Sequence, residues 1–237
     1  MEKTLRLDKL LSDSGQWSRK EAKQLLRQGR VQVDGQVERS ADRKVCPAAV
    51  QVTVDGQAVA WAEHRYLMLW KPAGVLTATE DRRQKTVLDL LPAMYRDLFP
   101  VGRLDKDTEG LLLLTDDGAL AHRLLSPRHH VDKVYLAEVD GDVDAADVEA
   151  FGAGMVLEDG TRCLSAGLER LGPGLCRVTL REGKFHQVKR MLAQRGKPVL
   201  RLKRISMGPL QLDPGLAPGE FRPLTEQELL ELEELQK

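Results

Sequence analysis

Several common sequence signatures are absent from this chain of 237 residues, and each absence excludes a class of protein. No apolar run approaches the roughly 20 residues of a membrane-spanning helix, and the longest runs lie at residues 66–70 and 111–114. The N-terminal residues lack the apolar core of a secretory signal peptide. Internal repeats and low-complexity tracts are also missing. We therefore expect an ordinary globular protein with one large domain or two smaller ones.

Cysteine is scarce as well. The three cysteines, Cys46, Cys163 and Cys176, are odd in number and far apart, and no C-x-x-C pair occurs. This spacing indicates neither a zinc site nor a disulfide framework, so we expect no metal. It is typical of a protein of the reducing cytoplasm, in which we expect the thiols to be small core residues.

A net charge is absent too, because 36 acidic side chains balance 36 basic ones. The charges are unevenly distributed, however. Residues 1–30 carry a net charge of +4, residues 181–204 carry +8, and the chain from residue 212 onward carries −5. One basic run is usually a solvated helix face. Two such runs, each beside an independent motif, are typical of a surface that binds a polyanion.

The first basic zone coincides with two predicted helices. Leucines at positions 7, 10 and 11 have helical spacing, so a short helix is expected to end near Gly15. A second helix should begin at a capping box of Ser18 and Glu21 and stop at Gly29.

Three basic residues of the second helix, Arg19, Lys23 and Arg27, are four apart and therefore share one face. The apolar residues at positions 22, 25 and 26 lie elsewhere on the helix. We expect the basic face to meet phosphates while the apolar face packs.

Two hairpin signals follow, Asp34-Gly35 and Asp55-Gly56, each between short apolar runs. Together with R-L-D-K-L-L near the start and R-V-x-V-D-G after the second helix, this pattern resembles an S4 RNA-binding domain over about residues 5–60. A helix-turn-helix DNA reader and a small packing domain without a ligand are the alternatives. The hairpin directly after the second helix favours the S4 domain.

We place an S4-like domain at residues 1–62 and a second domain at 63–237, with a short linker over 61–65. In the second domain we predict strands at 66–70, 111–115, 133–139 and 176–181, helices near 86–91, 118–125 and 186–195, and a last helix capped by Thr225 and Glu228. Several strands lie next to hairpin-like turns rather than helical crossovers. This favours an α+β fold whose largely antiparallel sheet is flanked by short helices.

Residues 102–118 read G-R-L-D-x-x-T-x-G-L-L-L-L-T-x-D-G and carry the most informative pattern. A polar loop with a central carboxylate, Asp105, leads into an apolar strand that ends in an Asp-Gly turn. Because a buried strand is fixed, it holds the preceding loop and its carboxylate in place. The string closely resembles the signature of the RsuA-type bacterial pseudouridine synthases, in which the matching Asp is the catalytic residue.

Three further segments resemble the same family in the same order. Residues 68–74 read M-L-W-K-P-A-G, like its strand-to-K-P-x-G loop, although Trp70 stands where Asn is usual. Residues 126–135 end in the family's K-x-Y strand, and residues 181–191 match its E-G-[KR]-x-H-Q-V-[KR]-R-M segment. Residues 196–208 continue like its closing active-site strand. The dipeptide Gly183-Lys184 is not a P-loop, because the earlier glycine spacing and the following Ser or Thr are absent.

The resemblance implies roles for individual residues. Lys189 is expected to pair with Asp105 and, as a nearby cation, to keep the pKa of that carboxylate low. Tyr135 is expected to line the active site, where it either stacks on the flipped base or moves a proton. Arg103 is a candidate to fill the space that the base vacates. Further RNA contacts are expected from Lys71, Arg128, His129, Lys184, His186 and Arg190.

Other polar residues are expected to have no part in the chemistry. His129 and His130 are poor joint metal ligands, because adjacent side chains on an extended chain point to opposite faces. We expect Asp107, Asp116 and Asp117 to be structural or exposed to solvent.

The implied reaction breaks the C1′–N1 bond of uridine, turns the base and joins C5 to C1′. It consumes no electrons, so we expect no cofactor and only one positioned, ionised carboxylate. Whether Asp105 attacks the base, attacks the sugar or abstracts a proton stays open at this point.

The segment S-P-R-H-H before K-x-Y most resembles family members that modify 16S rRNA, so we expect an isomerase of the 16S uridine-516 class. A 23S rRNA synthase of the same family is one alternative, and a non-catalytic RNA-binding or ribosome-assembly factor is another. The intact Asp105 loop, Tyr135 and Lys189 argue against the second alternative. No feature marks an oligomer interface, so we expect a monomer.

Overall fold

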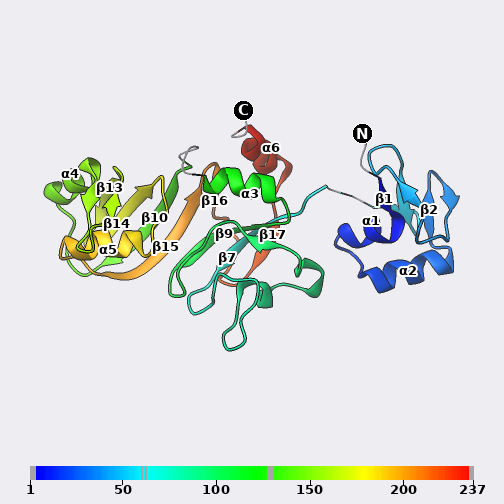
Figure 1. Cartoon of the computed structure of the whole chain (residues 1–237), viewed down its shortest axis with the longest axis horizontal. Helices are drawn as coiled ribbons and strands as arrows, with labels where there is room; N and C mark the ends of the chain where they lie inside the picture. Colours follow the sequence, from blue (N-terminus) through cyan, green and yellow to red (C-terminus); the bar gives the residue numbers. More distant parts are fainter. Residues whose placement is uncertain (1–3, 60, 62, 127–130, 235–237) are drawn as a thin grey trace. The chain divides into compact units, whose positions relative to one another are not determined.

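A computed structural model describes residues 4–59, 61, 63–126 and 131–234 of the chain (Figure 1). The chain divides into two compact units, Met1–His64 with Leu91–Asp97 and Arg65–Leu90 with Leu98–Lys237. The domain boundary expected after residue 62 stays a prediction, because residue 62 lies outside the described residues.

The first unit combines two helices with short strands. A four-stranded sheet has the order β3-β2-β5-β6, and β1 pairs with β4. The elements are β1 (Leu5–Arg6), α1 (Leu7–Asp13), α2 (Arg19–Gln28), β2 (Val31–Val33), β3 (Gln36–Val37), β4 (Lys44–Val45), β5 (Val52–Val54) and β6 (Gln57–Ala58). The leucines of α1, the apolar side of α2 and the valines of β2 and β5 form one buried core.

The local signals read from the sequence are present in this unit. The Ser18 hydroxyl accepts from the Glu21 N–H at 3.3 Å, and the Glu21 carboxylate accepts from the Ser18 N–H at 2.7 Å, which completes the capping box. Asp34 and Gly35, with φ of 51° and 79°, form the turn between β2 and β3. Positive φ at both central residues is what a tight hairpin with the right-handed strand twist requires.

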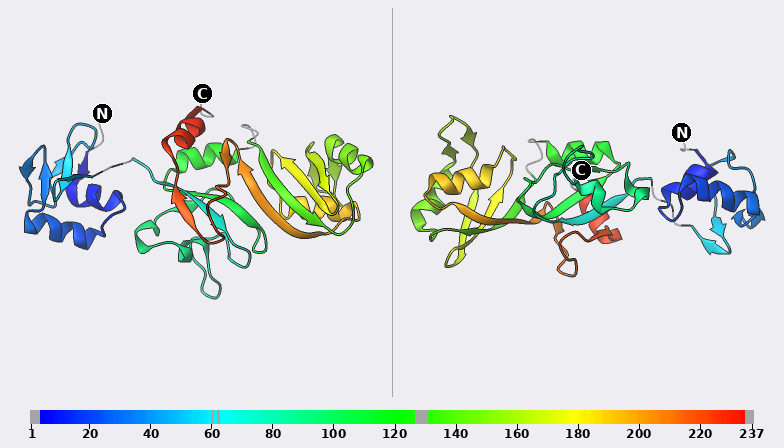
Figure 2. Two further views of the ribbon diagram at one scale, coloured as in Figure 1. Left: turned by 180° about the vertical axis from the view of Figure 1, so that it is seen from behind. Right: turned by 90° about the horizontal axis from the view of Figure 1, so that it is seen from below.

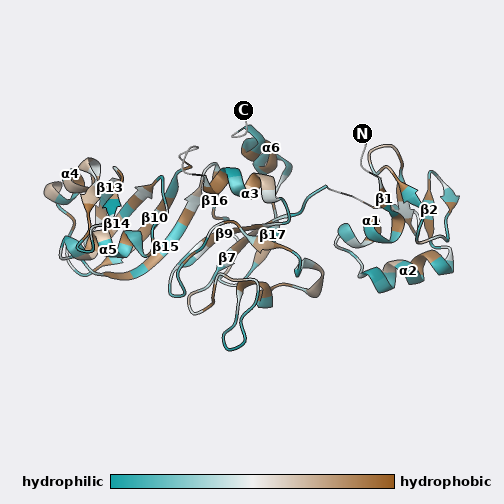
Figure 3. Cartoon of the chain, viewed as in Figure 1, coloured by the Kyte–Doolittle hydropathy of each residue, from teal (hydrophilic) through white to brown (hydrophobic). Residues whose placement is uncertain are grey.

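Helix α2 is amphipathic as expected. Its apolar residues are buried, whereas Arg19, Lys23 and Arg27 are all exposed. In Figure 3, α2 shows hydrophilic and hydrophobic residues on the same short helix.

The second unit is built on a nine-stranded mixed sheet. Its main path is β13-β14-β10-β15-β9-β7-β17, with β16 beside β15 and β8 beside β9. The strands are β7 (Tyr66–Lys71), β8 (Phe99–Pro100), β9 (Glu109–Thr115), β10 (Lys133–Val139), β13 (Gly167–Gly172), β14 (Leu175–Leu180), β15 (Val199–Met207), β16 (Leu210–Gln211) and β17 (Phe221–Pro223). Every pair is antiparallel except β15 with β9. The predicted α+β class with a largely antiparallel sheet is confirmed.

Helices flank two parts of this sheet. Helices α3 (Gly118–Leu125) and α6 (Glu226–Glu234) lie by β9 and β17, whereas α4 (Ala145–Ala153) and α5 (Gln187–Gln194) lie by β13 and β14 (Figure 1). The long, curved β15 runs along the sheet between these parts (Figure 2). A two-stranded ribbon of β11 (Met155–Val156) and β12 (Arg162–Cys163) completes the unit, with 3₁₀ turns at Val87–Leu90 and Ala93–Tyr95 elsewhere in the chain.

Strand β9 is the centre of the core, because all seven of its residues are buried. On one face Leu111 and Leu113 pack with Leu120 and Leu124 of α3 and with Leu232 of α6. A strand buried on both faces cannot slide without exposing apolar surface, so it fixes the loop that precedes it.

Some local expectations need correction. Asp117 does not form a simple turn with Gly118 but caps α3, since its carboxylate accepts from the Leu120 N–H at 2.9 Å. The helix expected near 86–91 is a 3₁₀ turn. Arg65, at the end of the expected linker, pairs with Asp116 at 2.9 Å. No helix in the described part of the chain is long and apolar enough to cross a membrane.

Candidate active site

The loop at residues 102–108 leads from β8 into β9 and is held by a second loop, residues 72–77. The Gly74 N–H donates to the Lys106 carbonyl at 2.7 Å. The Thr77 hydroxyl donates to the Leu104 carbonyl at 2.7 Å and accepts from the Leu104 N–H at 3.2 Å. The main chain on either side of Asp105 is therefore fixed by the second loop.

Lys71, at the end of β7, completes this arrangement. Its side chain is fully buried, and its ammonium donates to four backbone carbonyls at 2.9–3.2 Å. The acceptors are the carbonyls of Pro72, Asp105, Lys106 and Thr108. Burial lowers the pKa of Lys71 to about 8, against the raising effect of the carboxylates of Asp107 and Asp105. The expectation that Lys71 contacts RNA is wrong, because the lysine is enclosed by the loop that it holds.

The structure shows why glycine is required at position 110, just after this loop. It lies opposite Arg204 where β9 and β15 run parallel, and its φ is 108°. A Cβ atom at this position would collide with the Arg204 carbonyl oxygen. Only glycine permits so close an approach of the two backbones.

The Asp105 carboxylate, 26% exposed, lies between two side chains contributed by the start of α5. Its Oδ2 is 3.4 Å from Lys189 Nζ, and its Oδ1 is 3.5 Å from His186 Nε2. Lys189 also pairs with the exposed Asp107, and this ion pair lowers the pKa of the Asp107 carboxyl. The structure thus places Lys189 beside Asp105, as the resemblance implied.

His186 adopts an unusual backbone conformation at this point. It precedes α5 with φ of 49° and ψ of 34°, in the left-handed region that is uncommon for residues other than glycine. Its ring stacks on Phe185, with centroids 3.8 Å apart. Backbone strain of this kind persists only where the surrounding structure holds it in place. Here the strained conformation accompanies an imidazole that points at the Asp105 carboxylate.

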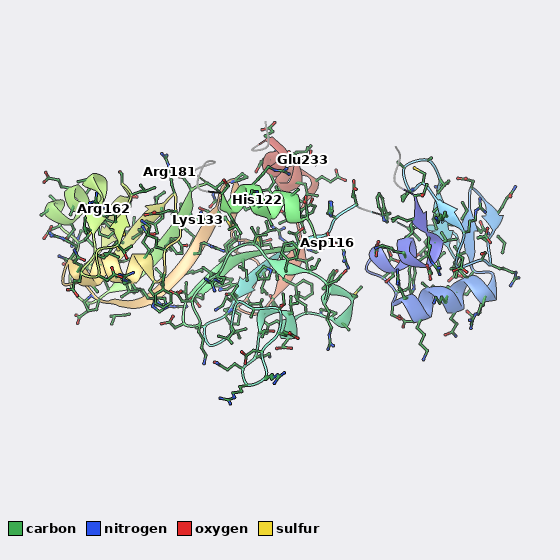
Figure 4. The ribbon with its side chains drawn as sticks, in the orientation of Figure 1. Asp116, His122, Lys133, Arg162, Arg181 and Glu233 are labelled. Atoms are coloured by element: carbon green, nitrogen blue, oxygen red, sulfur yellow. The ribbon has the colours of Figure 1, made fainter. Side chains whose placement is uncertain are left out.

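A cavity of about 670 Å³ opens beside Asp105. Its wall includes Tyr135, Lys133 and Arg204 from the sheet, Arg103 and Leu104 from the Asp105 loop, and Arg181, Lys184, Phe185 and His186 from the segment before α5. Figure 4 labels Lys133 on β10 and Arg181 next to the end of β14. The volume is in the range of small-ligand sites, and the lining is strongly basic.

The other expected RNA contacts lie in different settings. Arg103 is exposed and lines the cavity. Lys184 lines it too, but its ammonium binds the Arg162 carbonyl and lies 3.0 Å from Glu182. Arg190 faces Asp159, with 2.6 Å between Nη2 and Oδ1.

Arg128 and His129 lie outside the described residues. Arg19, Lys23 and Arg27 belong to the first unit and stay a predicted RNA surface. Asp116 and Asp117 have structural partners: Asp116 pairs with Arg65, and Asp117 accepts from the Tyr66 hydroxyl as well as capping α3.

Among the basic residues of the cavity wall, the sequence did not lead us to expect Lys133, Arg181 and Arg204. Lys133 is two residues before Tyr135 on β10, so alternation along the strand places both side chains on one face. Arg204 lies directly opposite Tyr135 on β15, which depends on a bulge that the sequence does not reveal.

Metal ligands are lacking in the part of the chain that the structure describes: no three His, Cys, Asp or Glu residues there come together. Cys163 and Cys176 are buried free thiols, and burial raises the pKa of Cys176 to about 11. What the site offers is one carboxylate with two basic neighbours, an aromatic hydroxyl and a basic wall. Such a site suits nucleophilic or charge-stabilising chemistry on an anionic substrate.

Comparisons with known proteins agree with this geometry. Residues 65–194 match a family described as RNA pseudouridylate synthase, and residues 5–50 match the S4 domain. Over 98% of this chain and 100% of the relative, the sequence is 48% identical to an uncharacterized RNA pseudouridine synthase of Bacillus subtilis (strain 168). It is 43% identical, over 95% of this chain and 98% of the relative, to ribosomal small subunit pseudouridine synthase A of Escherichia coli (strain K12). A crystal structure of a pseudouridylate synthase, 35% identical, aligns with a TM-score of 0.69 over 96% of this chain and 99% of that one.

Proposed function

Because this chain belongs to the RsuA-type family of RNA pseudouridine synthases and has an N-terminal S4 domain, we propose that it isomerises one uridine of 16S rRNA, of the uridine-516 class. We propose Asp105 as the residue on which the chemistry depends. The observation that carries the proposal is the Asp105 carboxylate, held by an immobilised loop 3.4 Å from Lys189 at the wall of a basic cavity.

The reaction needs a carboxylate that is positioned before the substrate arrives. The buried Lys71 ammonium holds the backbone carbonyls of Asp105 and Lys106, so little reorganisation of the loop is required when the nucleotide enters. The Lys189 ammonium, 3.4 Å from the carboxylate, offsets its negative charge, and His186 Nε2 lies 3.5 Å from the other carboxylate oxygen.

The target base has to leave its stack to reach Asp105, which costs a few kcal/mol. The exposed Arg103 stands beside Asp105 at the cavity and is placed to fill the space in the RNA. Tyr135 also lines the cavity, and we expect its ring or its hydroxyl to meet the base.

The choice of 16S rRNA rests on named relatives. Proteins called ribosomal small subunit pseudouridine synthase A, from Pseudomonas aeruginosa and Escherichia coli, share 42% and 43% identity with nearly the whole chain. The 48% identical relative carries no named substrate. Small-subunit RNA is therefore the substrate that the similarity supports best.

The test is pseudouridine mapping in rRNA from cells with and without the gene, complemented with wild type or Asp105→Asn. We expect one 16S position to lose its pseudouridine, wild type to restore it and Asp105→Asn to fail. Asp140→Asn, which changes an exposed carboxylate, is the matched control and should restore it fully.

The alternatives give different results. A missing 23S pseudouridine would assign the chain to the large subunit. An unchanged pseudouridine map, or full complementation by Asp105→Asn, would contradict the catalytic assignment and favour a non-catalytic RNA-binding factor.

A further inference from the structure

Two basic side chains in the cavity wall, Lys133 and Arg204, form no ion pair with any carboxylate of the described residues. Arg204 on β15 is 2% exposed and Lys133 on β10 is 9% exposed. The Arg204 Nε donates to the Leu111 carbonyl at 2.8 Å, but its Nη2 is buried and lacks a hydrogen-bond partner among the described residues. Lys133 Nζ donates to the Val131 carbonyl at 3.1 Å, and no ion pair in the described part of the chain includes either residue.

The two cations face the same space. Arg204 lies opposite Tyr135, and Lys133 precedes Tyr135 by two residues on the same strand. The three side chains therefore project from one face of the sheet, and all three line the cavity beside Asp105. The more exposed Arg181 of the same wall differs from them, because it has a carboxylate partner, Asp132, at 2.8 Å.

Burying two like charges together destabilises the protein unless a counter-charge offsets them. Burial lowers the pKa of Lys133, and the positive charge of Arg204 lowers it further, whereas Asp132 has the opposite effect. The Asp105 carboxylate is already occupied by Lys189 and His186. Among the described residues, therefore, no carboxylate forms an ion pair with either cation at the Lys133–Arg204 end of the cavity, and the nearby Asp132 pairs with Arg181.

We propose that Lys133 and Arg204 form a binding site for a backbone phosphate of the target nucleotide. The proposal rests on the proposed function and names the part of the substrate that this end of the cavity takes. A neutral uracil carbonyl would satisfy a donor but would not offset the charge, whereas each RNA nucleotide brings one phosphate charge with it. When the nucleotide flips, its phosphate moves with it, so the site holds the sugar in position while Asp105 acts on the base or the sugar.

The test measures binding without turnover. Uridine, uridine 5′-monophosphate and uridine 3′-monophosphate are titrated into the full-length protein by calorimetry. We expect one monophosphate to bind about tenfold or more tightly than uridine, as one charge-assisted hydrogen-bonded contact provides. The preferred isomer identifies which flanking phosphate is bound.

Three variants separate this site from the general basic surface. Lys133→Met removes the charge and keeps a side chain of similar length. We expect it to lower the affinity for the monophosphate to about the affinity for uridine, while the affinity for uridine stays unchanged. Lys133→Arg keeps the charge and should keep the preference. Lys85→Met makes the same change at an exposed loop position and should have no effect.

The unfolding temperature of the unliganded variants distinguishes binding from structural support. Lys133→Met removes an unbalanced buried charge, so it should be at least as stable as wild type. A preference that survives Lys133→Met, an equal loss in Lys85→Met, or a loss of binding accompanied by a lower unfolding temperature would each overturn the proposal.

This experiment is independent of the rRNA map. Asp105→Asn protein should show the same monophosphate preference as wild type, because the binding contact does not need the catalytic carboxylate. If rRNA loses no pseudouridine but the preference is present, the proposed function fails and the phosphate site stands. If the pseudouridine is lost from rRNA but no monophosphate preference exists, the proposed function stands and the phosphate site fails.

Discussion

The exposed cations of α2 and the buried cations around the cavity carry the same charge in opposite surroundings. Arg19, Lys23 and Arg27 lie in water on a helix face, where Lys23 Nζ is 3.8 Å from Asp8 Oδ2. Lys71 and Arg204, by contrast, are almost completely enclosed. Exposed charges act at a distance and are screened by salt, whereas buried ones act on specific atoms in a low dielectric. The first group suits capture of RNA, and the second suits positioning.

The largest effect that this contrast predicts is that of Lys71→Met. Four carbonyls lose their donor, so the Asp105 loop should relax and single-turnover rate should fall by about 100-fold, as a misplacement of about 1 Å can cause. Lys23→Met makes the same change on α2 and should leave the rate at saturating RNA unchanged. Equal rates for Lys71→Met and wild type would break the distinction between the two groups.

The next effect concerns the α2 face alone. Changing Arg19, Lys23 and Arg27 together to Gln should weaken RNA binding and lower the slope of log affinity against log salt by up to about 2, near 0.7 for each lost contact with single-stranded RNA. The rate at saturating RNA should not change. Lys44→Gln, at an exposed lysine of β4, should leave the slope alone. A triple variant with the wild-type slope would show that this face does not touch RNA.

A smaller effect is a pH dependence of stability. Burial lowers the pKa of Lys71 from the ordinary lysine value of 10.5 to about 8 in the folded protein, so between these pH values the unfolded chain binds more protons. Stability from this group therefore rises with pH across this window. In urea unfolding, wild type should gain stability relative to Lys71→Met between pH 8 and 10.5, by about 1.4 kcal/mol per unit of pKa difference. The same comparison with Lys23→Met should be flat, and a flat result for Lys71→Met would refute the burial effect.

The smallest predicted effect is at His186. His186→Ala and His186→Asn both remove the imidazole, but asparagine tolerates the left-handed conformation better than alanine does. His186→Ala should therefore be less stable by about 1 kcal/mol in denaturant unfolding. Equal stabilities would indicate that the backbone at His186 is not strained.

From the sequence, the identity of the site residues could be predicted better than the burial and neighbours of each residue. Asp105 lies in a continuous motif, and the apolar run after it already implies a buried strand that fixes the loop. Lys71 was misassigned because a lysine before Pro-Ala-Gly reads as an exposed loop cation. Its burial depends on carbonyls that lie 34 to 37 residues away.

Register explains what else was missed. That Arg204 faces Tyr135 depends on the bulge between β10 and β15, and no local pattern encodes it. Helix α4 escaped notice because its capping box is built from Asp144 and Asp147 instead of Ser or Thr with Glu. Local signals that conform to common patterns, such as Ser18 with Glu21, were predicted correctly.

The close approach at Gly110 has a consequence for how the protein is made. The hydrogen bond from Arg204 to the Leu111 carbonyl joins residues 93 apart in sequence. The part of the cavity wall that contains Arg204 therefore depends on a long-range pairing of the second unit. Long-range parallel strand pairing forms slowly, because the entropy cost of closing the long intervening loop comes before the contacts that offset it. During synthesis the Asp105 loop leaves the ribosome well before β15 does. A nascent chain therefore has its carboxylate but no finished cavity, and it becomes able to hold a nucleotide only when its synthesis is nearly complete.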